Sequence, residues 1–420
     1  MIEAPEAPEA PPPGLRERGG WTELLRHRRF LLFEGSALLS SAGYAVYSVS
    51  VLFLAYSISG NLLLAGLVLF IEYGVYTLTF LVAPLVDRAR DKRTVLLACL
   101  PLQALTAGLL ALQLDRGALT TPELLGAVLV LAVLWDFDWA VYMIGPRLLV
   151  DKRLLFAADG LTSALGVGTQ VGGYAGGGAL LYFIGPDGGA AAYALLLLAA
   201  ALVTIPLSLR LETSTTEAFW ASFRKGWASF QGRAARPLRQ FLGVESIYGF
   251  FVAVPPLLIT AIAYEWFGDP ASAYSILVTL YVVGGAIGGV IVGHYNPRRS
   301  VGVLLIVAPL VIGIAMLLLL AAPVELVALG ALLALADAFI SIRYTAKYSW
   351  VRATFDPEEL GRAVANIYFF TGVSSSVAAL TIGVLSTAIG LDGVIVVAGG
   401  GLLVAAAVAA AVPFIRTMRY

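Results

Sequence analysis

Long apolar runs constrain this chain more than any other feature of its sequence. The hydrocarbon core of a bilayer takes about 20 residues of α-helix, and twelve stretches of the chain reach that length. They cover approximately residues 30–56, 62–86, 94–114, 122–146, 158–184, 188–209, 238–263, 271–294, 300–321, 323–346, 363–388 and 391–415. None shows the period-two alternation that barrel strands need. The sequence therefore predicts an all-α integral membrane protein with twelve transmembrane helices.

The composition agrees with a membrane protein and excludes several other classes. Hydrophobic residues make up 59% of the chain and charged residues 13%, with a mean hydropathy of +0.87. One cysteine (Cys99) and two histidines (His27, His294) are too few for a zinc site or a disulfide framework. The 27 basic and 27 acidic residues leave no overall basic field for nucleic acid. We therefore expect no metal, no cofactor, no nucleic-acid partner and no enzymatic activity.

The chain divides into four predicted parts. Residues 1–20 repeat Glu-Ala-Pro and are expected to form a disordered tail. Residues 21–210 and 236–420 each hold six spans, and the linker 211–235 has aromatic residues at the spacing of an amphipathic helix. With the N-terminus in the cytoplasm, only Arg116 of the 27 basic residues lies outside. The positive-inside rule thus predicts a multi-pass plasma-membrane protein with both termini cytoplasmic.

The two halves repeat each other. At an offset of 206 residues, Gly43 matches Gly249, Lys92-Arg93 matches Arg298-Arg299, Gly166 matches Gly372, and Gly177 matches Gly383. An offset of 201 residues aligns Asp136 with Asp337, each in the middle of its span. Parallel six-span repeats are typical of alternating-access transporters, whose substrate site lies between the halves near the bilayer midplane. We therefore predict two pseudo-symmetric six-helix bundles.

Ionisable residues inside the spans are candidate functional residues, because an Asp at a helix centre costs about 2.5 to 3.5 kcal/mol on insertion. They are Glu34, Glu72, Asp136, Asp138, Glu245 and Asp337. Spans 3, 6, 9 and 12 hold none in their interiors, so they are expected to face lipid. We predict that these acids line a central cavity and that Asp136 and Asp337 carry protons there, since desolvation favours a neutral carboxyl. Structural roles, such as pairing with Arg147, Arg343 or Lys347, remain the alternative.

Aromatic residues accompany the acids. The predicted cavity includes Tyr44, Trp135, Trp139 and Tyr248. An apolar, aromatic pocket with a few carboxylates suits an amphipathic or cationic organic solute, which it would bind by burial and by cation–π contact. The expected partners are a small-molecule substrate, protons and the lipid bilayer, and the protein is expected to be a monomer.

The loop after the second span reads Ala83-Pro-Leu-Val-Asp87-Arg88-Ala-Arg90-Asp91-Lys92-Arg93. An Asp at a helix end beside a basic cluster can form charge-assisted bonds to neighbouring helix ends and stabilise one conformation. The segment resembles the loop 2–3 signature of the major facilitator superfamily, Gly-x-Leu-x-Asp-Arg-x-Gly-Arg-Lys/Arg. The resemblance implies a conformational latch made of Asp87, Arg88, Lys92 and Arg93.

The fifth span contains a glycine-rich motif whose glycines are Gly168, Gly172, Gly173, Gly176 and Gly177. Small residues at intervals of four let two helices pack closely, which is the structural interpretation. The motif is also similar to the span-5 signature of facilitator antiporters, with Gly173 in place of a proline.

Within the superfamily, the chain most resembles the drug and siderophore exporters, which are drug:proton antiporters. The resemblance implies proton-coupled export of an amphipathic or cationic solute by alternating access. One alternative is a proton-coupled importer of a nutrient or an organic anion, whose carboxylate Arg343 and Lys347 could receive. A second alternative is a non-transporting membrane receptor on the same scaffold, because a fold does not dictate a function.

Overall fold

The computed structural model describes residues 23–151, 154–210, 236–295, 301–355 and 357–418. The predicted tail and the predicted amphipathic helix of the linker lie outside the described residues. The N-terminal half contains α2 (Arg28–Ser59), α3 (Leu62–Tyr76), α4 (Thr79–Arg88), α5 (Arg93–Asp115), α6 (Thr121–Leu149), α7 (Leu155–Ile184) and α8 (Pro186–Thr204). The C-terminal half contains α10 (Arg236–Val252), α11 (Pro255–Trp266), α12 (Pro270–Tyr295), α13 (Val301–Leu318), α14 (Leu326–Thr354), α15 (Pro357–Ala411) and α16 (Pro413–Thr417).

These helices correspond to the predicted spans, and the fold class is confirmed. Span 2 is divided between α3 and α4, and span 7 between α10 and α11, where Pro255 cannot donate the backbone hydrogen bond that a continuous helix needs. The last two spans both lie in α15 and are separated by Gly390, whose φ of 68° is not helical. Among the described residues, nine helical stretches are long and apolar enough to cross a membrane.

The two ends of the helical bundle differ in their connections. Four of the turns at one end contain a glycine with a positive φ, a backbone conformation that glycine adopts at little cost in free energy. They are Gly60, Gly117, Gly185 and Gly390. We call this the glycine end. The opposite end carries Arg88, Lys92, Arg93, Arg147 and Arg352, and we call it the basic end.

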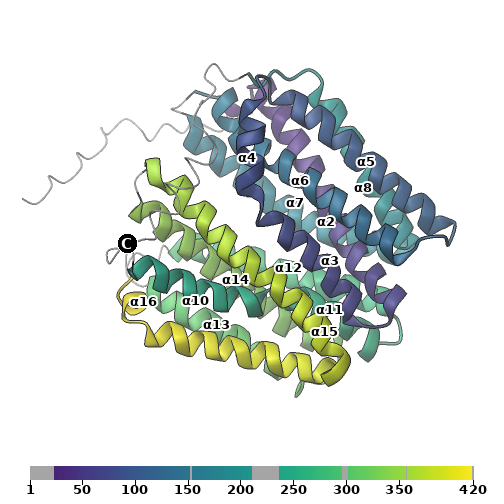
Figure 1. Cartoon of the computed structure of the whole chain (residues 1–420), viewed down its shortest axis with the longest axis vertical. Coiled ribbons are helices and arrows are strands. Elements are labelled where there is room, and N and C mark those ends of the chain that lie inside the picture. Colours follow the sequence, from purple (N-terminus) through teal and green to yellow (C-terminus); the bar gives the residue numbers. More distant parts are fainter. Residues whose placement is uncertain (1–22, 152–153, 211–235, 296–300, 356, 419–420) are drawn as a thin grey trace, which may run out of the picture.

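The helix contacts show the predicted repeat. In the N-terminal half α2 packs on α7, α5 on α8, and α6 on α3 and α4; in the C-terminal half α10 packs on α15, α13 on α15, and α12 on α14. Between the halves, α3 packs on α15 and α7 on α12, so these contacts also follow a two-fold arrangement. Figure 1 shows the two groups of helices side by side, coloured purple to teal and green to yellow.

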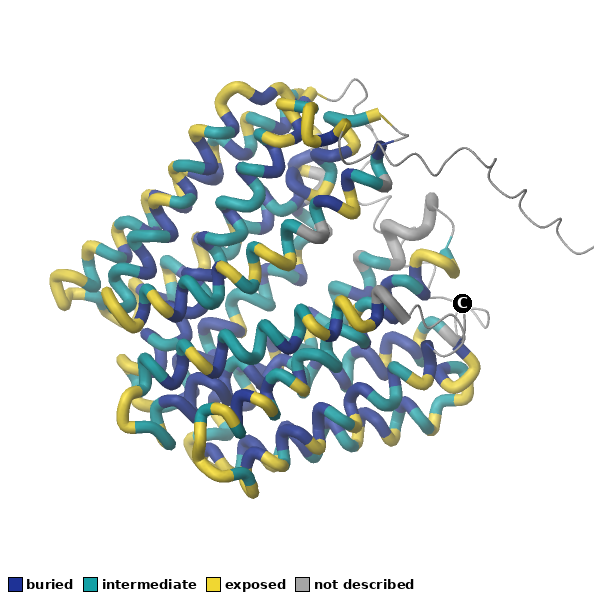
Figure 2. Tube along the Cα trace, turned by 180° about the vertical axis from the view of Figure 1, so that it is seen from behind, coloured by how far each residue is buried: buried dark blue, intermediate teal, exposed yellow. Residues whose placement is uncertain are grey.

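Small residues hold the halves together towards the glycine end. A Cβ at Gly66 of α3 would overlap the backbone of Ala379 in α15, and one at Gly178 of α7 would lie 2.9 Å from Ser275 Cβ in α12. Such contacts let helix backbones approach closely in a membrane, where burial against lipid gives little driving force. From there the halves diverge towards the basic end (Figure 2).

The helices predicted to face lipid expose apolar side chains. These include Leu102, Leu105 and Leu109 on α5, Leu195, Leu198 and Leu202 on α8, and Val303, Leu310 and Ile314 on α13. Each set recurs at roughly helical spacing and therefore covers one helix face. That face suits contact with acyl chains.

Candidate functional site

A central cavity lies between the two halves and consists of two adjoining pockets. Their volumes are about 360 and 320 Å³. Tyr44, Glu72 and Tyr73 line both pockets and therefore lie where they meet. These volumes fall within the range of small-molecule sites. The position between two six-helix bundles is where the sequence predicted the substrate site.

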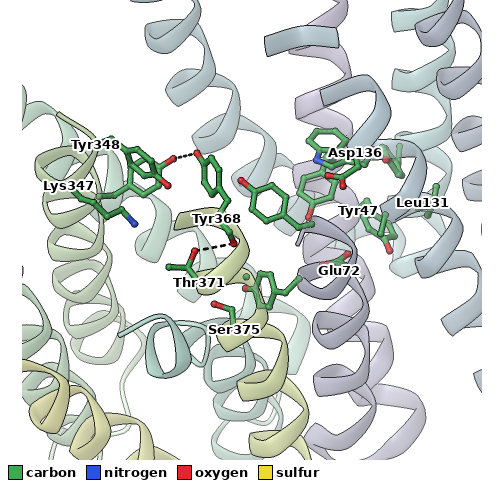
Figure 3. A pocket seen from close by; sticks show the side chains of 17 residues that line it. Tyr47, Glu72, Leu131, Asp136, Lys347, Tyr348, Tyr368, Thr371 and Ser375 are labelled. Carbon is green, nitrogen blue, oxygen red and sulfur yellow. Dashed lines mark hydrogen bonds between the residues drawn. The ribbon is translucent and has the colours of Figure 1, made fainter. Parts of the chain in front are cut away.

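The first pocket has walls from both halves (Figure 3). Glu72 of α3 and Trp135 and Asp136 of α6 line the N-terminal side, and Tyr44 of α2 stacks on Trp135 with ring centroids 4.2 Å apart. Lys347 of α14 lines the C-terminal side, together with Tyr344, Tyr348 and Tyr368. Positive charge and tyrosine hydroxyls thus face carboxylates and aromatic rings across the pocket.

The second pocket lies nearer the glycine end and contains Asp337 beside Tyr281. The halves are joined beyond it by hydrogen bonds. Tyr56 donates to Glu265 Oε1 at 2.8 Å, and Tyr264 donates to the carbonyl oxygen of Phe53 at 3.2 Å. The rings of Tyr56 and Tyr264 stack 4.6 Å apart. This pocket is therefore closed towards the glycine end by aromatic residues of both halves.

Asp136 and Asp337 occupy equivalent places in the repeat. Thr79 of α4 donates its hydroxyl to Asp136, at 3.0 Å from Oδ1 and 3.1 Å from Oδ2. Asp337 lies against Gly285 of α12, where a Cβ would overlap its Oδ2. Gly285 is the position equivalent to Thr79 at the 206-residue offset of the sequence repeat. Asp136 lines the first pocket and Asp337 the second, so both predicted residues reach the cavity but face different parts of it.

Asp138 and Glu34 do not line either pocket, and in this respect the structure differs from the prediction. Asp138 is fully buried inside the N-terminal half, where Gln103 Nε2 donates to its Oδ2 at 3.0 Å. Positions two apart on a helix differ by about 200°, so Asp138 must point away from Asp136. Glu34 accepts a 2.7 Å hydrogen bond from Thr162, between α2 and α7. Both carboxyls join helices of one half.

Glu245 belongs to a buried charge cluster behind the C-terminal wall. Arg343 binds both of its oxygens, with distances of 2.6 Å to Oε1 and 3.1 Å to Oε2, and Lys347 binds Oε2 at 3.1 Å. The Arg343 guanidinium lies 3.5 Å from the ring centroid of Tyr248. Glu245 and Tyr248 therefore lie outside the cavity lining. Only Lys347 connects this cluster to the first pocket.

Trp139, also predicted to line the cavity, lies outside both pockets. Its ring stacks on that of Trp135, with centroids 6.2 Å apart. Trp139 therefore supports a lining residue from behind.

The predicted latch residues make their described contacts within the N-terminal half. Buried Lys92 donates its ammonium to the carbonyl oxygens of Val86 and Ala89, at 2.8 and 3.0 Å, at the C-terminus of α4. Arg93 donates to the carbonyl oxygens of Ile205 and Leu207 after α8. Lysine and arginine stabilise helix C-termini in this way.

Of the other two latch residues, Arg88 is exposed, and the side chain of Asp87 lies outside the described residues. The loop between α4 and α5 thus joins helix ends of one half in this structure.

The span-5 glycines fall into two groups. A Cβ at Gly173 would contact Ala45 at 2.7 Å, and one at Gly177 would lie 2.9 Å from the Val46 backbone, so these two permit close packing of α7 on α2. Gly168, Gly172 and Gly176 have nothing within 4 Å of an added Cβ. The packing interpretation therefore applies to two of the five.

Most of the tyrosines that line the cavity were not predicted from the sequence. Tyr76, Tyr344, Tyr348 and Tyr368 line the first pocket, and Tyr174, Tyr274 and Tyr281 line the second. The spacing of Tyr73 with Tyr76 and of Tyr344 with Tyr348 is one helical turn, which was a usable signal. In the part of the chain that the structure describes, no group of three or more His, Cys, Asp or Glu could hold a metal ion.

Comparison with known proteins gives similarity in structure only. No protein-family model and no curated protein sequence matches the chain. A mutant of the nucleoside transporter NupG is similar over 90% of this chain and 99% of its own, with a TM-score of 0.74 and 12% identity. A POT family transporter in complex with a thioalcohol-conjugated peptide covers 90% of this chain and 94% of its own, with a TM-score of 0.71 and 8% identity.

A third solved structure is a bacterial homologue of the human lysosomal transporter Spinster, in an inward-facing and unoccupied conformation. It covers 94% of this chain and 99% of its own, with a TM-score of 0.69 and 13% identity. At these identities the comparisons show a shared fold, which is the predicted major facilitator fold.

Proposed function

We propose that this protein is a secondary transporter that moves a small amphipathic or cationic organic solute by alternating access. The observation that carries the proposal is the central cavity, which is lined by both halves and lies where these two pseudo-symmetric halves meet. Rocking of two such halves about a fixed site is how repeat-built transporters expose it to either side of a membrane. The structural likeness to a nucleoside transporter and to a POT family transporter supports this mechanism.

The lining supports a cationic or amphipathic solute. Glu72, Asp136 and Asp337 face the cavity, and among the described residues no cation forms an ion pair with them. Tyrosine rings surround the carboxylates, and a cation over such rings gains electrostatic energy. A solute with a positive group and an apolar body would use both features.

We further propose proton-coupled export. If the basic end faces the cytoplasm, as the positive-inside rule requires, the cavity is open towards the cytoplasm. A cationic solute and protons would then compete for the same carboxylates, and this competition would couple their movements. The direction of export follows from the resemblance to drug exporters.

Lys347 supports a second candidate, the uptake of an organic anion or a zwitterion. The cluster behind it holds two cations, Arg343 and Lys347, and one anion, Glu245, which leaves one positive charge in excess. Because Lys347 also lines the cavity, an anionic group of a solute could approach it there.

Ligand-induced thermal stabilisation of the purified protein, followed by flux assays, tests these proposals. We expect lipophilic amines to stabilise the protein more than carboxylates of the same size and hydrophobicity. In proteoliposomes, an imposed pH gradient should drive these amines uphill. Stabilisation by carboxylates alone would favour the second candidate, and the absence of flux despite ligand binding would favour a receptor.

A further inference from the structure

A second concave site lies at the basic end of the N-terminal half, away from the central cavity. Its volume is about 390 Å³. Its lining residues are Arg26, His27, Arg28, Arg29, Leu148, Leu149 and Ser208. They come from the start of α2, the end of α6 and the segment after α8. We call it the arginine pocket. None of its lining residues lines the central cavity.

The segment that carries the arginines packs against the N-terminal half. Leu24 and Phe30 are fully buried in a small apolar cluster with Leu154, Ala158 and Leu161. His27 is the N-cap of α2 and accepts a hydrogen bond from the Phe30 amide through Nδ1 at 3.3 Å. The guanidinium-bearing residues therefore lie at a capped and partly buried helix start.

No described side chain neutralises the charges of the arginine pocket through an ion pair. Arg26, Arg28 and Arg29 are all exposed, and no ion pair with any described side chain holds them. The first amides of an α-helix also lack intrahelical acceptors, so the start of α2 adds partial positive charge at the same place. Three guanidinium groups and a helix N-terminus together favour a phosphate, which arginine binds in a bidentate manner.

An apolar stripe leads away from the arginine pocket. Leu195, Leu198, Leu202 and Ile205 are exposed along α8, with 67% and 66% of Leu195 and Leu202 accessible. Their spacing places them on one face of the helix. The stripe ends at Ile205, three residues before Ser208 of the pocket. A ligand that fits both features has an anionic head group and hydrocarbon chains.

We propose that the arginine pocket binds the phosphate head group of an anionic phospholipid, whose acyl chains lie along the exposed face of α8. Basic pockets between transmembrane helices bind such head groups, and each nearby Lys or Arg contributes to the attraction. A soluble phosphate compound would use the same guanidinium groups but would not use the stripe on α8.

The test compares lipid binding by three forms of the full-length protein in detergent. The pocket variant carries Arg26→Gln, Arg28→Gln and Arg29→Gln. The control variant carries Arg147→Gln, Arg352→Gln and Arg416→Gln, which remove the same charge from exposed positions outside the pocket. Native mass spectrometry counts bound phosphatidylglycerol and phosphatidylcholine, and thermal melting reports stabilisation by each lipid.

We expect the wild-type and control proteins to retain phosphatidylglycerol and to be stabilised by it more than by phosphatidylcholine. The pocket variant should bind phosphatidylglycerol about 100-fold more weakly, in proportion to the three charges removed. Equal phosphatidylglycerol binding by the pocket and control variants would overturn the proposal. Displacement of the lipid by millimolar inorganic phosphate, or equal binding of phosphatidylcholine, would overturn it as well.

Discussion

Asp136 and Asp337 are the cavity residues whose positions bear most on the proposed proton coupling. Each carboxyl lies on a helix that faces the other half, and each meets the neighbouring helix at the same place in its repeat. Asp138, by contrast, is enclosed by Gln103 and Ser40. The two equivalent carboxyls and Glu72 line the cavity, whereas Asp138 does not.

We predict that Asp136→Asn and Asp337→Asn each abolish uphill transport driven by a pH gradient. Asparagine keeps the size of the side chain but cannot take up or release a proton, so at least one variant should still bind solute without pH dependence. Flux in proteoliposomes and ligand-induced melting measure the two properties. Asp115→Asn, at an exposed position near the glycine end, is the matched control. Uphill transport by both cavity variants would show that these carboxylates are structural.

The Glu245 cluster gives a prediction about stability. Glu245→Gln leaves the buried cations Arg343 and Lys347 without an anion, which typically costs about 3 to 5 kcal/mol. We therefore expect a clear fall in Tm. Adding Lys347→Met to Glu245→Gln returns the cluster to one excess positive charge and should recover part of that loss. If the double variant is less stable than Glu245→Gln, the three charges do not act as one unit.

At the scale of helices, interruptions and close contacts position the site. The break between α3 and α4 lies next to Thr79, which binds Asp136, and the break before α11 lies next to Pro256, which lines the second pocket. Local changes in helix direction thus coincide with cavity residues. The glycine contacts of α3 with α15 fix how closely the halves approach.

The helices could be predicted from sequence better than the faces they present. Apolar run length and charged loops located the spans, and the repeat located Asp136 and Asp337. The separation of Asp136 from Asp138 follows only when helix rotation is known. The Glu245 cluster depends on contacts between α10 and α14. The contacting residues lie about 100 positions apart in the sequence, and no local pattern encodes such contacts. The cavity tyrosines were missed because tyrosines also serve as ordinary packing residues in membrane helices.

The contact of α3 with α15 gives a prediction about conformation. Gly66→Val places a branched side chain against Ala379 and Gly383, so the halves should separate at the glycine end. Spin-label distances across that end should lengthen, and those across the basic end should shorten. Gly126→Val is the control, because nothing lies within 4 Å of a Cβ at Gly126. If the distances in Gly66→Val are as unchanged as those in the control, this contact does not limit how the halves open at the glycine end.

The molecule as a whole is two helical bundles that touch on one side of a shared cavity. Within the described residues, hydrogen bonds between the halves include those from Tyr56 to Glu265, Tyr264 to Phe53, Ser275 to Gly178 and Ser376 to Phe70. All of them lie at the level of the cavity or towards the glycine end. The proposed alternating access requires these contacts to open when the basic end closes.

We therefore expect a transported solute to change the separation of the basic ends. Spin labels at Arg147→Cys in α6 and Arg352→Cys in α14 report this separation. Cys99, the single cysteine of the chain, is buried. In proteoliposomes a solute that is transported should populate a second, shorter distance. A solute analogue that binds without being transported should leave the long distance dominant. One unchanged distance under all conditions would contradict a rocking mechanism.

The glycine turns also determine what a protease can reach. At the glycine end the chain reverses within one or two residues at Gly60, Gly185 and Gly390, and Arg116 is the lone basic residue placed there by sequence. Trypsin cleaves after Lys or Arg and needs several residues of accessible chain. Added to sealed vesicles from the side of the glycine end, it should leave the protein whole or cut once near Arg116; added from the other side, it should produce many fragments. The sidedness of digestion would thus report the orientation of the protein in its native membrane without any label.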